Sequence, residues 1–177
     1  MTLKVCKFGG TSMADGNTMQ AVKKIIESDE KRKFVVVSAP GKRFNGDIKV
    51  TDLLYACYDE LNKKGDCKQA FASVRQRFES IVKELNIQMD ISSVLDETEK
   101  RLEEEKSSDF TASRGEYLSA RIMAELLGAK FIDSEDVVFF KADGQLAGEK
   151  TYRAISSAIM RAERYSPREA VKSLLFS

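Results

Sequence analysis

Histidine is absent from this chain of 177 residues. Its absence excludes the serine–histidine and cysteine–histidine mechanisms of nucleophilic catalysis, together with the commonest general base at neutral pH. The groups that remain for chemistry are carboxylates, lysines, hydroxyls and backbone amides. Any catalysis by this chain must therefore use those groups.

Three other kinds of feature are scarce. The three cysteines, Cys6, Cys57 and Cys67, form no CxxC pair, so we expect neither a disulfide framework nor a zinc site and assign no metal ligands. The 29 basic and 28 acidic residues leave a net charge of +1, which indicates no nucleic-acid partner. No window approaches the roughly 20 apolar residues of a membrane span, and the N-terminus lacks a long apolar signal region. We therefore expect a cytoplasmic protein without a membrane partner.

The beginning of the chain has the pattern of an α/β protein. With 42% hydrophobic residues, the chain is long enough for one domain, or for one domain and a fragment. Residues 3–8 alternate as a strand does, residues 17–28 have an apolar face at helical spacing, and residues 34–37 form a β-branched run. A strand, helix and strand in this order predict a parallel pair with a right-handed crossover.

Helical periodicity dominates the middle of the chain, after a polar loop at residues 42–49. We predict helices at residues 51–61, 68–85, 91–105 and 110–127. Beyond Gly128 the pattern predicts strands at 129–132 and 137–140, a helix at 151–164, and a short helix from the Ser166-Pro167 pair to Leu175.

A glycine turn follows the first predicted strand, at the sheet edge where ligands bind in α/β proteins. Gly9 and Gly10 would let the backbone approach a ligand and present N–H groups to phosphate oxygens. Lys7 adds a positive charge, and Thr11 and Ser12 add hydroxyl donors. These groups suit phosphoryl transfer. The lysine precedes the glycines, unlike in a P-loop, and the spacing alone favours a purely structural turn.

Glu116 is the most unusual carboxylate, because it lies on the apolar face of the helix predicted at 110–127. That face carries Ala120, Met123 and Leu127. A carboxylate on such a face needs a partner. The pattern leaves two alternatives open: a structural ion pair with Arg114, Arg121 or a lysine, or the ammonium group of a substrate.

Two hydroxyl residues are further candidates, and each has a structural alternative. Ser38 follows the second predicted strand, at the same edge as Lys7 if the strands are parallel, although serine commonly ends strands by bonding its own backbone. Thr51 stands near the start of a predicted helix, where its simplest role is that of an N-cap.

Four segments together resemble the aspartokinases of the amino-acid kinase family, in the family's order. The opening LKVCKFGGTSMAD, with its KFGGTS core, is followed by VVSAP at 36–40, VTDLL at 50–54 and SRGE at 113–116. The resemblance covers residues 2 to about 150. It implies an α/β fold, a three-layer α/β/α sandwich around a mostly parallel sheet that is incomplete at its C-terminal side.

The resemblance also implies a reaction, the transfer of the γ-phosphoryl group of ATP, with Mg²⁺, to the β-carboxylate of L-aspartate. That carboxylate is the nucleophile, so no histidine base is required. A relative that phosphorylates glutamate or carbamate is disfavoured by KFGGTS together with SRGE. Carried over residue by residue, the roles are contact of Lys7 with the transferring group, phosphate binding by Gly9, Gly10, Thr11 and Ser12, and an aspartate pocket of Ser38, Thr51 and Glu116.

The family's later RGGSD-type segment and nucleotide-binding strands have no counterpart here. We expect residues 1–160 to form the substrate-binding part of the kinase domain, and residues 161–177 to depart from the family through truncation or an altered frame. Because the missing segments would position and stabilise the reacting groups, we expect negligible kinase activity from the chain alone. We also expect self-association into a homo-oligomer that covers the exposed sheet edge. The alternative is a non-catalytic remnant that binds aspartate or phosphate, or associates with a partner subunit.

Overall fold

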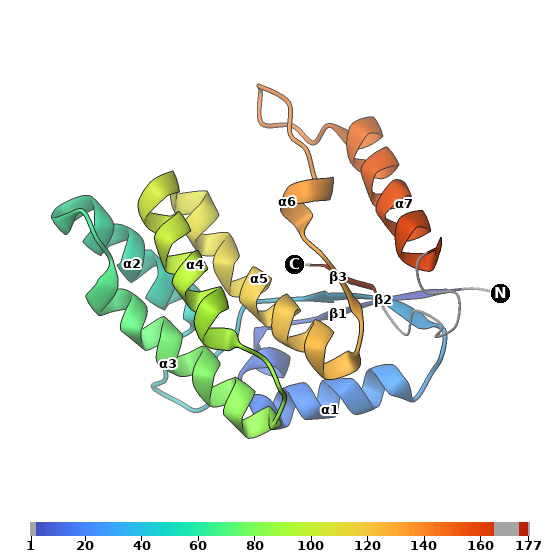
Figure 1. Ribbon diagram of the computed structural model, residues 1–177, viewed down its shortest axis with the longest axis horizontal. Coiled ribbons are helices and arrows are strands. Elements are labelled where there is room, and N and C mark those ends of the chain that lie inside the picture. Colours follow the sequence, from blue (N-terminus) through green and yellow to red (C-terminus); the bar gives the residue numbers. More distant parts are fainter. Residues whose placement is uncertain (1–2, 165–173, 177) are drawn as a thin grey trace.

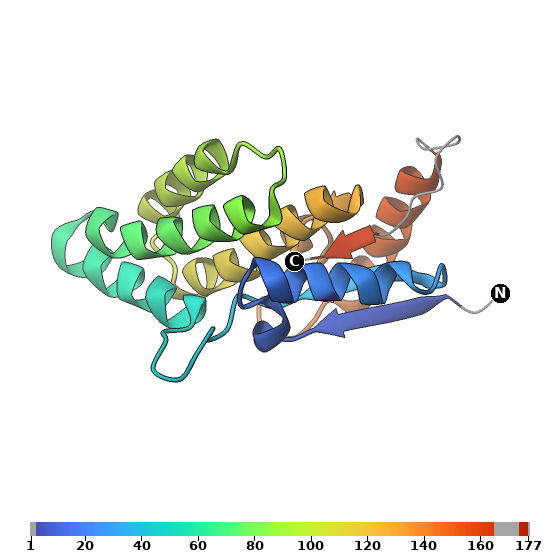
Figure 2. The same cartoon turned by 90° about the horizontal axis from the view of Figure 1, so that it is seen from below.

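The computed structural model describes residues 3–164 and 174–176, and its first four elements form a parallel strand pair with a connecting helix. They are β1 (Lys4–Phe8), the 3₁₀ helix η1 (Gly10–Met13), α1 (Gly16–Glu27) and β2 (Arg32–Val37). The two strands are parallel, as expected, with Lys7 opposite Val36. Figure 2 shows β1 running from the N-terminus towards η1, with α1 beside it. The carboxyl ends of both strands therefore lie at one edge.

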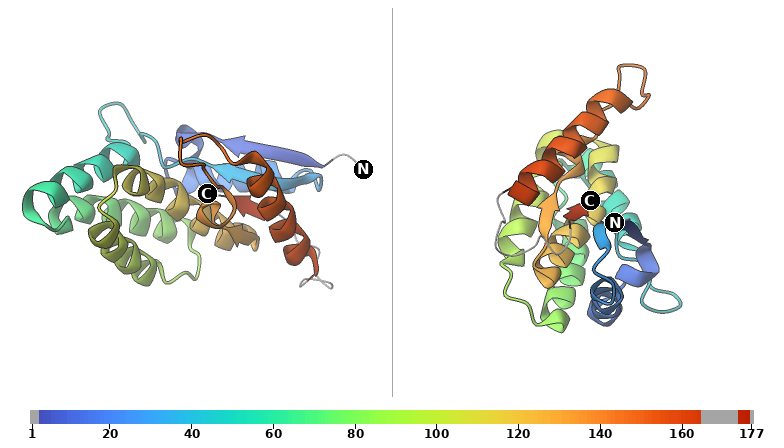
Figure 3. Two further views of the ribbon diagram at one scale, coloured as in Figure 1. Left: turned by 90° about the horizontal axis from the view of Figure 1, so that it is seen from above. Right: turned by 90° about the vertical axis from the view of Figure 1, so that its right-hand side faces the viewer.

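The middle of the chain is helical, and the predicted windows are confirmed with small shifts at their ends. The elements are α2 (Val50–Lys64), α3 (Lys68–Leu85), α4 (Ile91–Glu105) and α5 (Ser108–Leu127). Local side chains explain where α4 and α5 begin, because Asp90 accepts a hydrogen bond from Ser93 N and Ser107 accepts one from Phe110 N. Figure 3 shows α2, α3 and α4 gathered beyond the carboxyl ends of β1 and β2.

Two predictions about the C-terminal part are wrong. The elements there are β3 (Lys130–Ile132), α6 (Ser134–Val137), α7 (Gly148–Arg164) and β4 (Leu174–Phe176). No strand forms at 137–140: Asp133 caps α6, and Phe140 makes only an isolated bridge to Leu146. A short apolar run cannot by itself distinguish a strand from other structure. Leu174 and Leu175 are in a strand instead of a helix, and the remainder of that predicted helix lies outside the described residues.

Within the described residues the strands form one parallel sheet in the order β1-β2-β4-β3. Val35 and Val37 of β2 are buried in the larger core with α1 and α5, whereas Phe34 packs in a smaller cluster with apolar residues of α7. Alternate residues of a strand face opposite sides of its sheet. Helices therefore cover both faces, with α1 and α5 on one side and α7 on the other (Figure 1), which confirms the three-layer α/β/α fold.

The larger core extends from the sheet into the helices. Its most deeply buried large side chains include Met19, Leu54, Phe71, Phe78, Leu95, Leu118 and Met123, each 0% exposed. Among the described residues, no helix has the length and apolar character needed to cross a membrane.

Candidate functional site

Lys7 and Ser38 meet where β1 and β2 end. The parallel register continues one step beyond β2, because Ser38 N donates to Phe8 O over 3.0 Å. Lys7 Nζ lies 3.5 Å from Ser38 Oγ, at the outer limit for a hydrogen bond. The lysine is exposed, so its ammonium group is accessible to a ligand at this edge.

The glycine turn is shaped by the neighbouring segment at residues 39–41. Gly41 N donates to Gly10 O over 2.8 Å, and a Cβ on Gly10 would lie 3.0 Å from Ala39 O. Gly10 is therefore required by close packing of backbone on backbone, which is the structural alternative recognised from spacing. Gly9 has open space around it, and Ser12 N donates to Gly9 O over 2.9 Å within the 3₁₀ turn.

Glu116 is half-buried, and its partner is the backbone. The N–H of Ala39 donates to Glu116 Oε1 over 3.2 Å, and the predicted helix face is buried at Ala120, Met123 and Leu127. Among the described residues no ion pair involves Glu116. The two arginines proposed as its partners have other contacts: Arg114 donates to Ser113 Oγ and lies over the Phe110 ring, and Arg121 donates to Tyr117 Oη. The structural ion pair with these arginines is therefore not formed.

Gly115 explains how α5 comes close enough for this contact. A Cβ at that position would lie 2.6 Å from Ala39 Cβ and 3.3 Å from Leu54 Cδ1. Only glycine therefore lets α5 approach both α2 and the segment that follows β2. Glycine inside a helix costs about 1 kcal/mol relative to alanine, and that cost was the signal in the sequence that could have revealed this residue.

Thr51 does not cap α2, so the simpler of its two roles is wrong. The N-cap is Lys49, which makes no side-chain cap hydrogen bond, and Thr51 is the second residue of the helix. Val50 N donates to Pro40 O over 3.0 Å, which attaches the start of α2 to the segment after β2. Thr51 is therefore free of the capping role that would have competed with ligand contact.

These residues surround a pocket of about 400 Å³. Five predicted site residues line it, whereas Lys7, Gly9 and Ser12 are not part of its lining. Lys7 contacts Ser38, which is one of the lining residues. Sequence reasoning missed the other half of the wall, which comes from the turn after β2 and from the loop that follows. The lining residues are Gly10, Thr11, Ser38, Ala39, Pro40, Gly41, Lys42, Lys49, Thr51 and Glu116.

The pocket combines cationic, acidic and hydroxyl groups. Lys42, Lys49 and Glu116 line it together with the hydroxyl residues Thr51 and Ser38. An arrangement with both signs of charge suits a ligand that itself carries an ammonium group and carboxylates. No group of three or more Cys, Asp or Glu side chains able to hold a metal ion occurs in the described part of the chain.

Residues 2–168 match the model of the Amino acid kinase family. The chain belongs to this family. Aspartokinase 3 of Bacillus subtilis (strain 168) is 38% identical over 141 residues, which cover 76% of this chain and 31% of that protein. The aspartokinase of Chlamydia muridarum (strain MoPn / Nigg) is 35% identical over 159 residues, covering 81% of this chain and 34% of that protein. The chain thus spans about a third of the length of these relatives.

Solved structures of aspartate kinases are also similar to this chain. The aspartate kinase of Clostridium acetobutylicum superposes with a TM-score of 0.90 at 40% identity, covering 99% of this chain and 38% of that one. Aspartokinase III of E. coli, in complex with aspartate and ADP, has a TM-score of 0.74 at 21% identity, covers 98% of this chain and 40% of that one, and supports the fold. The resemblance to aspartokinases noted in the sequence is therefore confirmed.

In this member of the amino acid kinase family, an ionic network around the buried side chains of Asp47 and Arg77 organises the loop between β2 and α2. Asp47 accepts from Arg43 Nε over 2.8 Å and from Arg77 Nη2 over 2.9 Å. The hydrogen bond from Arg43 holds the pKa of the Asp47 carboxyl well below its ordinary value of 3.8. Burial lowers the pKa of the Arg77 guanidinium, against the opposing effect of Asp47. The network was not anticipated, because Arg77 lies 30 positions after Asp47 in the sequence.

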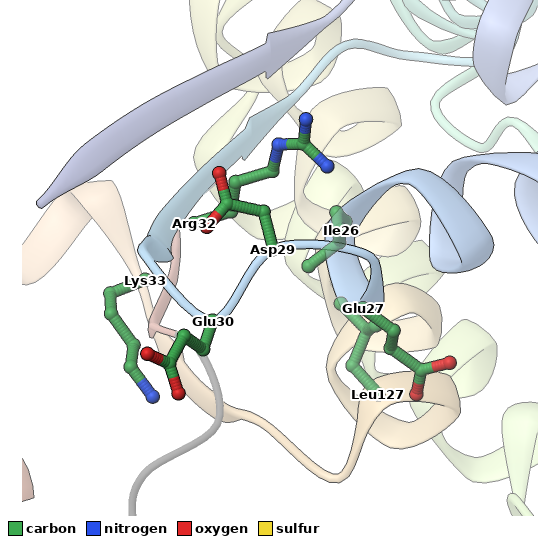
Figure 4. Close-up of a pocket in the computed structure, with 7 residues that line it drawn as sticks. All are labelled: Ile26, Glu27, Asp29, Glu30, Arg32, Lys33 and Leu127. Atoms are coloured by element: carbon green, nitrogen blue, oxygen red, sulfur yellow. The ribbon is translucent and has the colours of Figure 1, made fainter.

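A smaller pocket of about 260 Å³ lies at the other end of β2 (Figure 4). Charged side chains of both signs surround it, and Asp29 Oδ2 accepts a hydrogen bond from Lys4 Nζ over 2.6 Å. None of the predicted site residues is among its lining residues, which are Ile26, Glu27, Asp29, Glu30, Arg32, Lys33 and Leu127. The candidate site is therefore confined to the carboxyl edge of the strands.

Proposed function

We propose that this chain is the L-aspartate-binding part of an aspartate kinase, which transfers the γ-phosphoryl group of ATP to the β-carboxylate of L-aspartate. The observation that carries the proposal is the meeting of Glu116, Ser38 and Thr51 in one pocket beside Lys7. Three separate segments of the chain converge there, and all three belong to the motifs shared with aspartokinases. The structure of E. coli aspartokinase III contains aspartate and ADP, which are ligands of the same classes as those proposed here.

In this proposal Glu116 binds the α-ammonium group of L-aspartate. Its Oε1 accepts from Ala39 N, which orients the carboxylate and leaves Oε2 for the substrate. The hydroxyls of Ser38 and Thr51 contact the substrate from the carboxyl end of β2 and the first turn of α2. The first helical turn also favours a negatively charged group. The β-carboxylate of the substrate is then directed towards Lys7.

Lys7 lies where charge develops on the phosphoryl group. Its ammonium group stabilises that charge, while Gly9, Gly10, Thr11 and Ser12 present N–H and hydroxyl groups to phosphate oxygens. A substrate carboxylate attacks without losing a proton, so a chain without histidine suffices. The described residues offer no cluster of acids for Mg²⁺. The ion would arrive with ATP and neutralise phosphate charge there.

Calorimetric titration of the 177-residue chain with L-aspartate tests the pocket. We expect binding that is abolished in Glu116→Gln and retained in Glu125→Gln, a control on an exposed position of the same helix. Titration with L-glutamate provides the test of specificity. Unchanged affinity in Glu116→Gln would refute the assignment, and a wild-type chain without affinity for L-aspartate would favour the non-catalytic remnant.

We further propose that these 177 residues alone have negligible kinase activity. The chain spans about a third of its aspartokinase relatives, and phosphoryl transfer depends almost entirely on positioning and on the full set of charges around the phosphates. A coupled assay for ADP with ATP, Mg²⁺ and L-aspartate measures this directly. Robust turnover would contradict the proposal. The division of the chain after residue 160 also stays a prediction, which limited proteolysis would test.

Self-association remains a proposal as well. In the described sheet β1 is an outer strand, and Leu3 and Val5 are 48% and 69% exposed. An exposed strand edge with apolar side chains favours pairing with a second chain. Sedimentation velocity is the measurement, and a monomeric profile at all concentrations would count against a homo-oligomer.

A further inference from the structure

Arg77 is a buried arginine that contacts the loop beside the pocket, although it lies on α3 and is not part of the pocket wall. Its side chain is 4% exposed. Nη1 donates to Gly41 O over 3.1 Å, and Nη2 donates to Asp47 Oδ2 and to Ile48 O, each over 2.9 Å. One guanidinium therefore binds both ends of the loop at residues 41–48.

Asp47 completes this arrangement from within the loop. Its Oδ2 also accepts from Arg43 N over 3.0 Å and from Arg43 Nε over 2.8 Å, and its Oδ1 accepts from Arg43 Nη2 over 2.9 Å. The loop between Val37 and Val50 contains no helix or strand, so these side-chain bonds replace the regular backbone pairing that would otherwise hold it.

The ends of the loop form part of the pocket wall that the sequence analysis did not predict. Gly41 and Lys42 line the pocket at one end, and Lys49 and Thr51 line it just beyond the other. A backbone hydrogen bond also links the loop to the glycine turn, because Gly41 N donates to Gly10 O over 2.8 Å. A movement of the loop would therefore shift the lysines, the glycine turn and the start of α2 together.

Such a network contributes little net free energy to the stability of the fold. Removing charged groups from water costs several kcal/mol per ion, and well-packed apolar residues often serve stability equally well. What the planar guanidinium provides is a fixed geometry, since its donors point in set directions to several acceptors at once. We propose that Arg77 and Asp47 are positioning residues that hold the loop wall of the aspartate pocket in its binding geometry, an inference that rests on the function proposed above.

Amide hydrogen exchange on Arg77→Met tests the positioning without any ligand. The amides of Gly41, Arg43, Asp47 and Val50 are all hydrogen-bonded, so they report on the loop. We expect exchange at these amides to rise about tenfold or more, while protection in α5 stays within the change caused by Arg75→Met. Arg75 is a matched control, because it is on the same helix and pairs with Asp96 and Glu99 away from the loop.

Affinity for L-aspartate gives the second measurement. We expect Arg77→Met to weaken binding about tenfold, equivalent to about 1.4 kcal/mol, and Arg75→Met to leave it unchanged. Lysine in Arg77→Lys keeps the charge but lacks the planar set of donors. This variant should therefore recover stability to urea without recovering the protection of the loop amides from exchange. Unchanged exchange at the loop amides of Arg77→Met would overturn the proposal, as would an equal loss of protection throughout the chain. If the wild-type chain binds no L-aspartate, the proposed function fails, and the exchange data alone decide on positioning.

Discussion

Gly115→Ala tests how α5 brings its carboxylate to the candidate pocket. The new Cβ would lie 2.6 Å from Ala39 Cβ, whereas carbon atoms pack at about 3.5–4.0 Å. The helix and the segment after β2 must therefore separate by about 1 Å. The distance from Ala39 N to Glu116 Oε1 is already 3.2 Å, so a separation of this size would break that hydrogen bond.

Two effects oppose each other in the stability of this variant. Alanine is favoured over glycine inside a helix by about 1 kcal/mol, whereas overpacking costs about 1–3 kcal/mol. We expect the free energy of unfolding in urea to fall by about 1 kcal/mol. We also expect amide exchange at Ala39 to rise, and affinity for L-aspartate to fall about tenfold through the lost orientation of Glu116.

Gly148→Ala is the matched control for this variant. Its Cβ would meet Tyr152 at 3.6 Å, an ordinary contact, at the start of α7. We expect unchanged affinity and a stability equal to or slightly above that of the wild type. The reasoning would be refuted if Gly115→Ala were more stable than the wild type, with the wild-type affinity and the wild-type exchange rate at Ala39.

Three further predictions concern stability, each measured by urea unfolding. Asp47→Asn should cost about 3 kcal/mol at neutral pH. Because the folded state lowers the pKa of Asp47, the loss should shrink as pH falls below about 3.8, and a constant difference down to pH 3 would contradict this. Phe78→Ala, at a side chain 0% exposed, should cost about 4 kcal/mol, whereas Tyr152→Ala, at 66%, should cost under about 1 kcal/mol; equal losses would count against the assigned core. Ser107→Ala removes the acceptor for Phe110 N and should cost about 1 kcal/mol, so an unchanged midpoint would argue against the cap.

The elements predicted correctly depend on residues close together in the chain. Helices α3 and α4 begin and end where the apolar spacing indicated, and the β-branched run of β2 pairs in parallel with β1. The exceptions are the apolar segments whose neighbours lie far away. The apolar run at residues 137–140 makes one isolated bridge and no further strand pairing among the described residues. Leu174–Phe176 is a strand because it pairs with β2 on one side and with β3 on the other.

The candidate site divides in the same way. The sequence by itself determined the family, the glycine turn after Lys7 and the presence of an acidic residue on an apolar helix face, since short motifs and periodicity carry these. Only the tertiary structure decided that Glu116 is held by Ala39, 77 positions away, and that Arg77 holds a loop 29 to 36 positions before it. Such contacts depend on which surfaces the packing of α2, α3 and α5 brings together, and no local pattern records that choice.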